Sequence, residues 1–200
     1  MDGGVTAVSL RSRLEHEVER RLGCAAEVRE TGVGEDLPQP TFAGLRAQPE
    51  AATNEVALVH GTSRADKAWP LSHWVELGQR LDKQGCGLAL MHGNDNEACE
   101  ASQIQAQLKA AGAQVDLWPR SDLSTLTKRL AACRGVIGVD GGVSHIAVAL
   151  GLPHVQIYNF DTAWRTGPLH EPQQISVFDS PFPSVDQVWQ AWLTSVARAV

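Results

Sequence analysis

The sequence predicts an α/β fold built on a doubly wound, mostly parallel sheet. Short apolar or β-branched runs recur along residues 56–178, and amphipathic helical patterns fill the gaps between them. Strands that alternate with helices need crossover connections, which place parallel strands between two helical layers. With 43% hydrophobic residues the chain can also bury a substantial core. The expected strands are VALVH (56–60), GLALMH (87–92), VDLW (115–118), GVIGV (135–139), HVQIY (154–158) and ISVF (175–178).

The helical patterns between these runs begin at residues that favour helix N-termini. In the last helix the N-cap is followed three residues later by Gln187, which completes a capping box. A short fourth helix runs to Leu150 and stops at Gly151. The expected first residues or caps of the five helices are Ser72, Asn96, either Ser121 or Asp122, Ser144 and Ser184.

The first 54 residues differ in character from the rest. Apolar residues at a spacing of four from Leu10 to Leu22 predict one amphipathic helix. Residues 25–55 are then rich in glycine, proline and acidic residues and have no sustained period. So long a segment without structure is uncommon inside a compact domain, so we interpret it as a linker or boundary. A compact domain is expected from near Glu55 onward.

Charge and hydropathy narrow the classes of protein. The chain has 17 Lys and Arg against 23 Asp and Glu, a formal net charge of −6, which argues against a nucleic-acid binder held by bulk charge. Its apolar runs are far shorter than the roughly 18 residues of a membrane span. The N-terminal residues lack the pattern of a secretory signal, so the expected location is cytoplasmic.

The four cysteines do not predict a functional site. Cys24, Cys86, Cys99 and Cys133 show no spacing typical of a zinc or redox centre, so they are expected to be reduced thiols and no metal site is predicted. Cys86 and Cys133 lie in or near apolar runs and are interpreted as small core residues.

Ligands of open α/β sheets bind beyond the carboxyl ends of the strands, where the strand order reverses. In the common order 3-2-1-4-5-6 that point lies between the first and fourth strands. The loop after the first strand, HGTSRADKAWP (60–70), offers Gly61, the hydroxyls of Thr62 and Ser63, and the cations Arg64 and Lys67, a set suited to phosphate oxygens. The alternative is a solvated polar turn. Trp69 is expected to anchor the loop against the sheet.

The loop after the fourth strand is DGGVSH (140–145). Gly141 and Gly142 allow left-handed or closely approached backbone, and the following helix presents its N-terminus, an arrangement suited to a diphosphate. Asp140, directly after the buried strand, can accept hydrogen bonds from a polyol. His145 lies in the first helical turn, where a ligand role and a structural role are both open. Neither a P-loop nor a GxGxxG dinucleotide motif occurs in the sequence.

One acidic residue follows the second strand. Glu97 in HGNDNE (92–97) can bond a ribose or an adenine edge, as acidic groups at such positions do. The alternative is an acid placed in the first turn of a helix because the helix dipole favours it there.

Taken together, these motifs carry a family resemblance. HGTSRADKAWP, HGNDNE and VDGGVSHIAVALGLPHVQIY, in this order and at these separations, resemble the C-terminal domain of the ADP-heptose:lipopolysaccharide heptosyltransferases, glycosyltransferase family 9, which have the GT-B fold. NFDTAWRTGP and PSVDQVW are similar to the heptosyltransferase I branch. The resemblance covers roughly residues 55–200 and implies a Rossmann-like ADP-sugar donor-binding domain there. Residues 1–54 would then be the end of the N-terminal domain and the interdomain linker.

The resemblance also implies roles for single residues. Thr62, Ser63 and Lys67 would hold the donor diphosphate, and Lys67 would neutralise charge on the departing ADP. Glu97 would contact the adenosine, and Asp140 would bind heptose hydroxyls. The turn of Gly141 and Gly142, together with His145, would complete the diphosphate pocket. Family members often carry Thr in place of Gly141, so this chain lacks the hydroxyl contact of that residue.

The implied reaction is inverting transfer of heptose from ADP-heptose to a Kdo hydroxyl of Kdo-lipid A, with ADP stabilised electrostatically as it leaves. Acceptor recognition and the general base belong to the family's N-terminal domain, which is expected to be missing from this chain. The chain alone is therefore expected to transfer poorly or not at all. The implied location is cytoplasmic, peripheral at the inner face of the inner membrane, and assistance by a divalent ion stays open.

Three other functions stay open at this point. The chain could be a truncated module that binds an ADP-sugar without catalysing its transfer. A nicotinamide-dependent oxidoreductase is disfavoured because the dinucleotide motif does not occur. A sugar-nucleotide epimerase on a similar scaffold would need catalytic groups from both domains.

Overall fold

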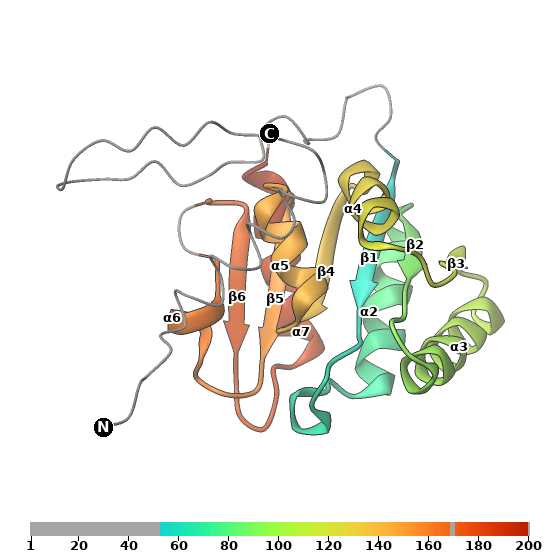
Figure 1. The fold of residues 1–200 in the computed structure, drawn as a ribbon, viewed down its shortest axis with the longest axis horizontal. Coiled ribbons are helices and arrows are strands. Elements are labelled where there is room, and N and C mark those ends of the chain that lie inside the picture. Colours follow the sequence, from blue (N-terminus) through green and yellow to red (C-terminus); the bar gives the residue numbers. More distant parts are fainter. Residues whose placement is uncertain (1–52, 169–170, 200) are drawn as a thin grey trace, which may run out of the picture. The chain divides into compact units, whose positions relative to one another are not determined.

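Six parallel strands form one sheet in the order β3-β2-β1-β4-β5-β6 (Figure 1). The computed structural model describes residues 53–168 and 171–199, which belong to one compact unit of the chain. All six predicted runs form strands, and their order is the common one from which the position of the site was inferred. The helix expected over Leu10–Leu22 and most of the expected linker lie outside the described residues. The strands are β1 Glu55–Val59, β2 Gly87–Leu90, β3 Val115–Leu117, β4 Gly135–Val139, β5 His154–Tyr158 and β6 Gln174–Phe178.

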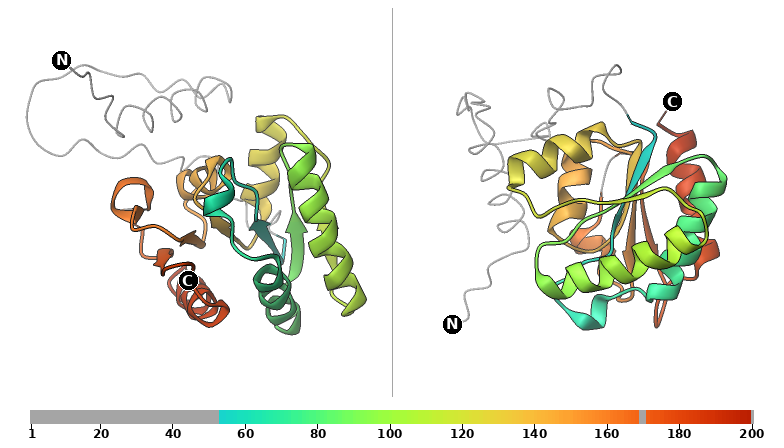
Figure 2. Two further views of the ribbon diagram at one scale, coloured as in Figure 1. Left: turned by 90° about the horizontal axis from the view of Figure 1, so that it is seen from below. Right: turned by 90° about the vertical axis from the view of Figure 1, so that its right-hand side faces the viewer.

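Helices cover both faces of the sheet, as Figure 2 shows edge-on. Alternate residues of β1 separate the two cores: Val56 and Leu58 face one cluster, Ala57 and Val59 the other. Helices α2, α3 and α7 bury their apolar stripes in the first cluster, and α4 and α5 in the second. The helical segments are η3 Ala65–Lys67, α2 Leu71–Lys83, α3 Asp95–Ala110, α4 Leu123–Ala132, α5 Gly142–Ala149, α6 Ala163–Thr166 and α7 Val185–Ala197.

Two helix caps agree with the sequence. The side chain of Asp122 accepts a hydrogen bond from the Thr125 N–H at the start of α4. Ser184 and Gln187 form the predicted capping box of α7. Because these short polar side chains satisfy N–H groups that the helix itself cannot, they fix where each helix begins.

Three predicted helix starts are wrong. Helix α2 begins at Leu71, because Pro70 already holds the extended N-cap conformation, so Ser72 lies inside the helix. Helix α3 is capped by Asn94, whose side chain reaches the Glu97 N–H three residues on, so Asn96 is also internal. Helix α5 begins two residues before Ser144, because the Ser144 hydroxyl donates back to the Val139 carbonyl at 2.7 Å.

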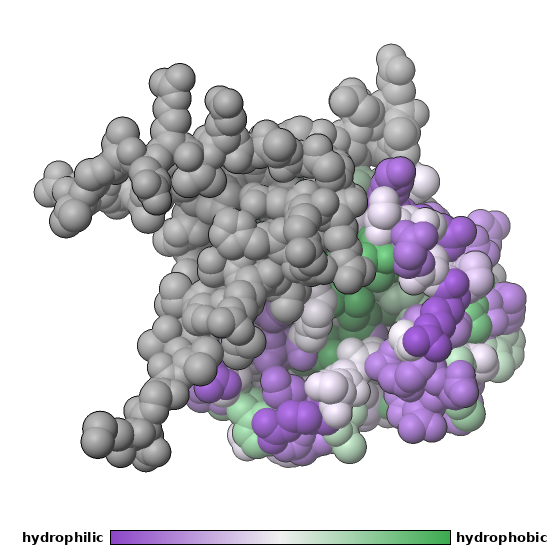
Figure 3. Space-filling model, viewed as in Figure 1, coloured by the Kyte–Doolittle hydropathy of each residue, from purple (hydrophilic) through white to green (hydrophobic). Residues whose placement is uncertain are grey.

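The outer surface over α3 and α4, on the right in Figure 3, is mainly hydrophilic. This agrees with α3, which buries Ala101, Ile104 and Leu108. Among the described residues, no helix is both long and apolar enough to span a membrane.

The described cysteines agree with the sequence interpretation. Cys86, Cys99 and Cys133 are free thiols, and Cys86 and Cys133 are buried. Burial raises the pKa of the Cys133 thiol to about 12, which keeps it protonated and unreactive at neutral pH.

Candidate functional site

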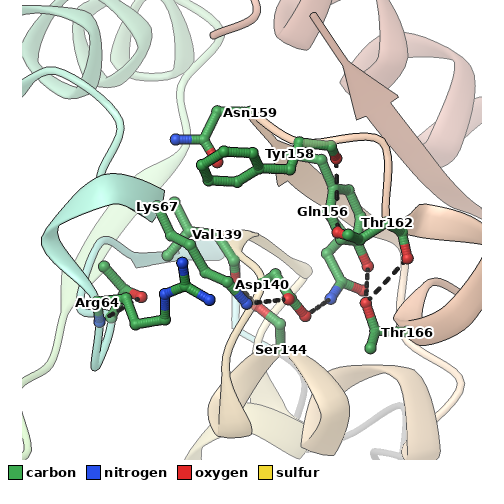
Figure 4. A network of polar contacts seen from close by, with 12 residues as sticks. Arg64, Lys67, Val139, Asp140, Ser144, Gln156, Tyr158, Asn159, Thr162 and Thr166 are labelled. Atoms are coloured by element: carbon green, nitrogen blue, oxygen red, sulfur yellow. Dashed lines mark hydrogen bonds and ion pairs between the residues drawn. The ribbon is translucent and has the colours of Figure 1, made fainter. Parts of the chain in front are cut away.

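The loops after β1 and β4 meet at the point where the strand order reverses. β1 and β4 are neighbours in the sheet, so their carboxyl ends lie side by side. There the ammonium of Lys67 pairs with the carboxylate of Asp140, with Nζ 2.6 Å from Oδ2, although 73 residues separate the two in the sequence. Figure 4 shows this pair at the centre of a network of polar contacts. The structure thus brings together the two loops that the sequence singled out.

The two oxygens of the Asp140 carboxylate have different partners. Oδ2 faces Lys67, while Oδ1 accepts a hydrogen bond at 3.2 Å from the side-chain amide of Gln156 in β5. The Nε2 atom of His145, in the first turn of α5, lies 3.6 Å from Oδ1. Only 9% of Asp140 is exposed, so its orientation is set by these neighbours rather than by solvent.

The turn that carries Lys67 is exposed and is connected to the far side of the site. Its 3-10 helix, η3, has no side-chain cap. The side-chain amide of Asn159, just after β5, donates to the carbonyl of Asp66. Lys67 is therefore held by its own ion pair and by a contact to the residue before it.

Arg64 is engaged within the same turn. Its guanidinium bonds both carboxylate oxygens of Asp66, which lowers the pKa of that carboxyl. The expectation that Arg64 and Lys67 jointly face a phosphate is therefore corrected: Lys67 faces the site, and Arg64 is paired locally. Thr62 accepts a hydrogen bond from the Arg64 N–H at 3.3 Å, which shapes the turn, and Ser63 is exposed beside it.

The start of α5 forms the opposite side of the site. The N-cap residue is Gly141, which has no side chain to accept hydrogen bonds from the N–H groups of the first turn. A Cβ on Gly142 would meet no atom within 4 Å, which leaves space in front of the helix N-terminus. Of the two alternatives that the glycines allow, left-handed backbone is not adopted, because Gly141 has an extended φ of −166° and Gly142 begins the helix. Glycine gives close access here rather than an unusual dihedral.

Glu97 lies in the first turn of α3 and contacts the loops that follow β1 and β2. Its Oε2 accepts a hydrogen bond from the Gly93 N–H at 2.7 Å, and its backbone carbonyl lies 3.0 Å from Nε2 of His60. A Cβ on Gly61 would come within 2.7 Å of the Glu97 Cδ. Gly61 therefore makes room for this carboxylate, a reason that the loop sequence alone did not indicate. Burial lowers the pKa of His60, which favours its neutral form.

Trp69 anchors the first loop as predicted. The indole is 3% exposed, belongs to the core cluster on one face of the sheet, and donates from Nε1 to the Pro183 carbonyl at 2.8 Å. It packs edge-on against Trp74. The loop therefore leaves the site along a fixed path into α2.

Sequence reasoning missed two residues of the site, Gln156 and Asn159. Gln156 carried a signal, since it is the polar centre of the otherwise strand-forming run HVQIY and is fully buried. Asn159 carried none, because its partner Asp66 lies 93 residues away.

The described part of the chain contains no group of three or more His, Cys, Asp or Glu side chains that could hold a metal ion.

The fold and the site together define a Rossmann-like α/β domain of the kind that binds an anionic ligand beyond its strand ends. The sequence model of glycosyltransferase family 9 (heptosyltransferase) matches residues 7–188, and the chain belongs to this family.

Curated relatives of the chain are lipopolysaccharide heptosyltransferases. Lipopolysaccharide heptosyltransferase 1 of Pseudomonas aeruginosa is 32% identical over 160 residues, which cover 76% of this chain and 42% of the relative. The enzyme of the same name from Salmonella typhimurium is 30% identical over 153 residues, which cover 74% of this chain and 46% of the relative. The chain thus spans less than half the length of these relatives.

Solved structures of the family have the same fold. Escherichia coli heptosyltransferase WaaC with ADP matches with a TM-score of 0.64 and 25% identity, covering 74% of this chain and 46% of that one. The same enzyme with ADP-2-deoxy-2-fluoro heptose matches with a TM-score of 0.63 and 21% identity, covering 99% of this chain and 57% of that one. The predicted α/β fold and family are confirmed.

Proposed function

We propose that this chain is the donor-binding half of an inverting heptosyltransferase, which transfers heptose from ADP-heptose to a Kdo residue of Kdo-lipid A. The observation that carries the proposal is the Lys67–Asp140 pair, 2.6 Å between Nζ and Oδ2, at the switch point of the sheet. It is supported by the related structures of WaaC, which hold ADP and an ADP-heptose analogue.

The site offers a separate set of groups for each part of the donor. The diphosphate would lie between the β1 loop, with Thr62, Ser63 and Lys67, and the helix start formed by Gly141, Gly142 and His145. Asp140 would accept hydrogen bonds from heptose hydroxyls, and Glu97 would contact the adenosine. The ammonium of Lys67 and the positive end of the α5 dipole both favour the negative charge of the diphosphate.

This half of the enzyme would promote the reaction by stabilising negative charge on the leaving group. The bond between the anomeric carbon and the diphosphate oxygen breaks as a Kdo hydroxyl attacks from the opposite face, and negative charge accumulates on the departing ADP. Lys67 stabilises that charge. The proton of the attacking hydroxyl needs a base within hydrogen-bond reach. Asp140 is assigned here to the heptose hydroxyls and is paired with Lys67, so we assign the base to the acceptor-binding half of the enzyme.

This function implies a place of action. An acceptor embedded in a membrane by its lipid requires the enzyme to work at the membrane surface. We therefore place the protein in the cytoplasm, peripheral at the inner face of the inner membrane.

A second candidate is a module that binds the ADP-sugar and catalyses nothing. It is favoured by one observation: the groups of the described site, Lys67 and Asp140 among them, are all assigned to the donor. Heptose transfer to Kdo-lipid A, measured with the purified chain and again after adding a separately produced acceptor half, distinguishes the two. Restored transfer in the mixture supports the enzyme, and transfer by the chain alone would overturn the assignment of the base to the other half.

Calorimetric titration of the chain with ADP, ADP-heptose and UDP-sugars tests the donor assignment. We expect ADP ligands to bind more tightly than UDP ligands. Lys67→Ala should weaken ADP binding by about 10- to 100-fold, the effect of losing one or two charge-assisted hydrogen bonds. Lys83→Ala, at an exposed lysine in the last turn of α2, is the matched control and should change nothing. Equal affinity for both nucleotide classes, or an unaffected Lys67→Ala variant, contradicts the proposal.

A further inference from the structure

A glutamine stands at the centre of a buried strand, where an apolar residue would be expected. Gln156 is the middle residue of β5 and has no exposed surface. Its neighbours Val155 and Ile157 point into the apolar core on the other face of the sheet. Burial of an amide is costly unless its hydrogen bonds are made, so the presence of Gln156 needs a reason.

The register of the sheet explains how this side chain reaches the site. Gln156 is paired with Gly138 of β4, and Asp140 follows two residues later on the same face. Gly138 has no side chain to block the path, and a Cβ there would lie 2.6 Å from the Ser144 Oγ. The amide of Gln156 therefore extends past Gly138 to Oδ1 of Asp140, 3.2 Å away (Figure 4).

The orientation of the amide is set by chemistry. A carboxylate only accepts hydrogen bonds, so the NH₂ group must face Asp140 and the carbonyl oxygen must face away. That oxygen, Oε1, is buried and makes no hydrogen bond of ordinary geometry among the described residues, although the Gln156 side chain raises the pKa of His154 against the larger effect of burial. The next residue on the same face of the strand, His154, likewise leaves its Nε2 unpartnered while its Nδ1 bonds the Val136 carbonyl.

An unsatisfied buried oxygen lowers stability, and an apolar side chain of the same shape would avoid this cost. Packing therefore does not account for Gln156, whose amide donates to Asp140. What the residue does contribute is one fixed bond to the Asp140 carboxylate: with Oδ1 held, Oδ2 is turned toward Lys67.

We propose that Gln156 is a positioning residue for sugar recognition, which holds the Asp140 carboxylate in the orientation that receives the heptose. The inference rests on the proposed function, because Asp140 is assigned there to the sugar. Gln156 acts through Asp140 and does not itself contact the donor. The proposal predicts that loss of the Gln156 amide affects binding of the sugar part of the donor more than binding of the nucleotide part.

The test compares Gln156→Met with Gln174→Met. Methionine has a similar length and no donor group, so both variants keep the packing. Gln174 is a buried amide in the next strand, β6, and donates to the Val148 carbonyl at 2.9 Å, away from Asp140. Each variant is titrated with ADP-heptose and with ADP, and its thermal unfolding midpoint is measured.

We expect Gln156→Met to weaken ADP-heptose binding by about ten-fold, the effect seen in metal sites when a hydrogen bond that orients a ligating side chain is lost. ADP binding should change by less than about three-fold. Its unfolding midpoint should change little, because removal of the unpartnered Oε1 offsets the loss of the hydrogen bond to the Asp140 carboxylate. Gln174→Met should leave the ratio of the two affinities at the wild-type value.

Unchanged ADP-heptose affinity in Gln156→Met would overturn the positioning role and leave the proposed function standing. Equal losses for ADP and ADP-heptose, together with a lowered midpoint, would assign Gln156 to packing and also overturn it. If the wild-type chain prefers UDP-sugars, the proposed donor is wrong. The positioning role is then read from the UDP-sugar against UDP, with the same expected ratio.

Discussion

The two loops that meet in the site are built in opposite ways. The β4 loop is short and rooted in the core: Asp140 is 9% exposed, the chain passes directly into α5, and Ser144 in the first turn of that helix is fully buried. The β1 loop is longer and mostly exposed, and Lys67 is held there by Asp140 and by the contact of Asn159 with Asp66. The carboxylate is thus fixed by the core, whereas the ammonium is fixed by residues that are distant in the sequence. Changes to the packing behind the β4 loop should affect folding, and changes around the β1 loop should affect nucleotide binding.

The largest effect is expected on stability at low pH, and it comes from the buried histidine His154 in β5. Burial lowers the pKa of His154 from 6.5 to about 4. The unfolded chain therefore binds a proton more readily than the folded chain, and stability falls as pH falls from 6.5 toward 4. The full loss is about 3 kcal/mol, given 1.36 kcal/mol for each pKa unit. Denaturant unfolding at a series of pH values measures it. In His154→Gln the free energy of unfolding should depend less steeply on pH between 6.5 and 4. An equally steep loss in that variant would contradict the assignment to His154.

Next in size is a steric change behind the β4 loop. In Gly138→Ala the new Cβ would lie 2.6 Å from the Ser144 Oγ and 2.7 Å from the Val59 Cβ. Such overpacking should lower the free energy of unfolding by about 1–3 kcal/mol, measured by denaturant unfolding. Gly142→Ala is the matched control, since its Cβ meets nothing within 4 Å, and should change stability by less than about 0.5 kcal/mol. Equal effects of the two substitutions would remove the distinction between a packed strand and an open helix start.

The smallest effect is expected on the exposed side. Asn159→Ala removes the contact to the Asp66 carbonyl that helps to hold the turn of Lys67. ADP affinity should fall about five-fold, the effect of one modest hydrogen bond, with little change in stability. Asn96→Ala, at an exposed asparagine inside α3, is the control for calorimetry. A larger loss of stability than of affinity would place Asn159 with the core instead.

Much of the fold could be predicted because its signals are local. The six strands follow from apolar runs, and Asp122 and Ser184 follow from capping chemistry that acts over three residues. The helix starts at Ser72, Asn96 and Ser144 were wrong because each has a neighbour that serves better. Pro70 and Asn94 supply two of the starts, and the Ser144 hydroxyl bonds Val139 instead.

The site could be predicted in part for a related reason. The order of the strands brings the β1 and β4 loops together, so Lys67 and Asp140 were identifiable. The pairing of Arg64 depends on the side-chain geometry of one turn, and the space that Gly61 leaves for Glu97 and the amide bond of Gln156 depend on side-chain geometry across the sheet. No spacing in the sequence encodes such contacts, although a glutamine within a buried strand indicates that one exists.

A crystal structure of this chain with ADP-heptose tests the central claim most directly. We expect the diphosphate within hydrogen-bond distance of the Lys67 ammonium and of the first-turn N–H groups of α5, with a heptose hydroxyl on Asp140. The Gln156 bond to Oδ1 should remain in place. A nucleotide bound elsewhere, with the diphosphate in contact with neither Lys67 nor the start of α5, would contradict the account.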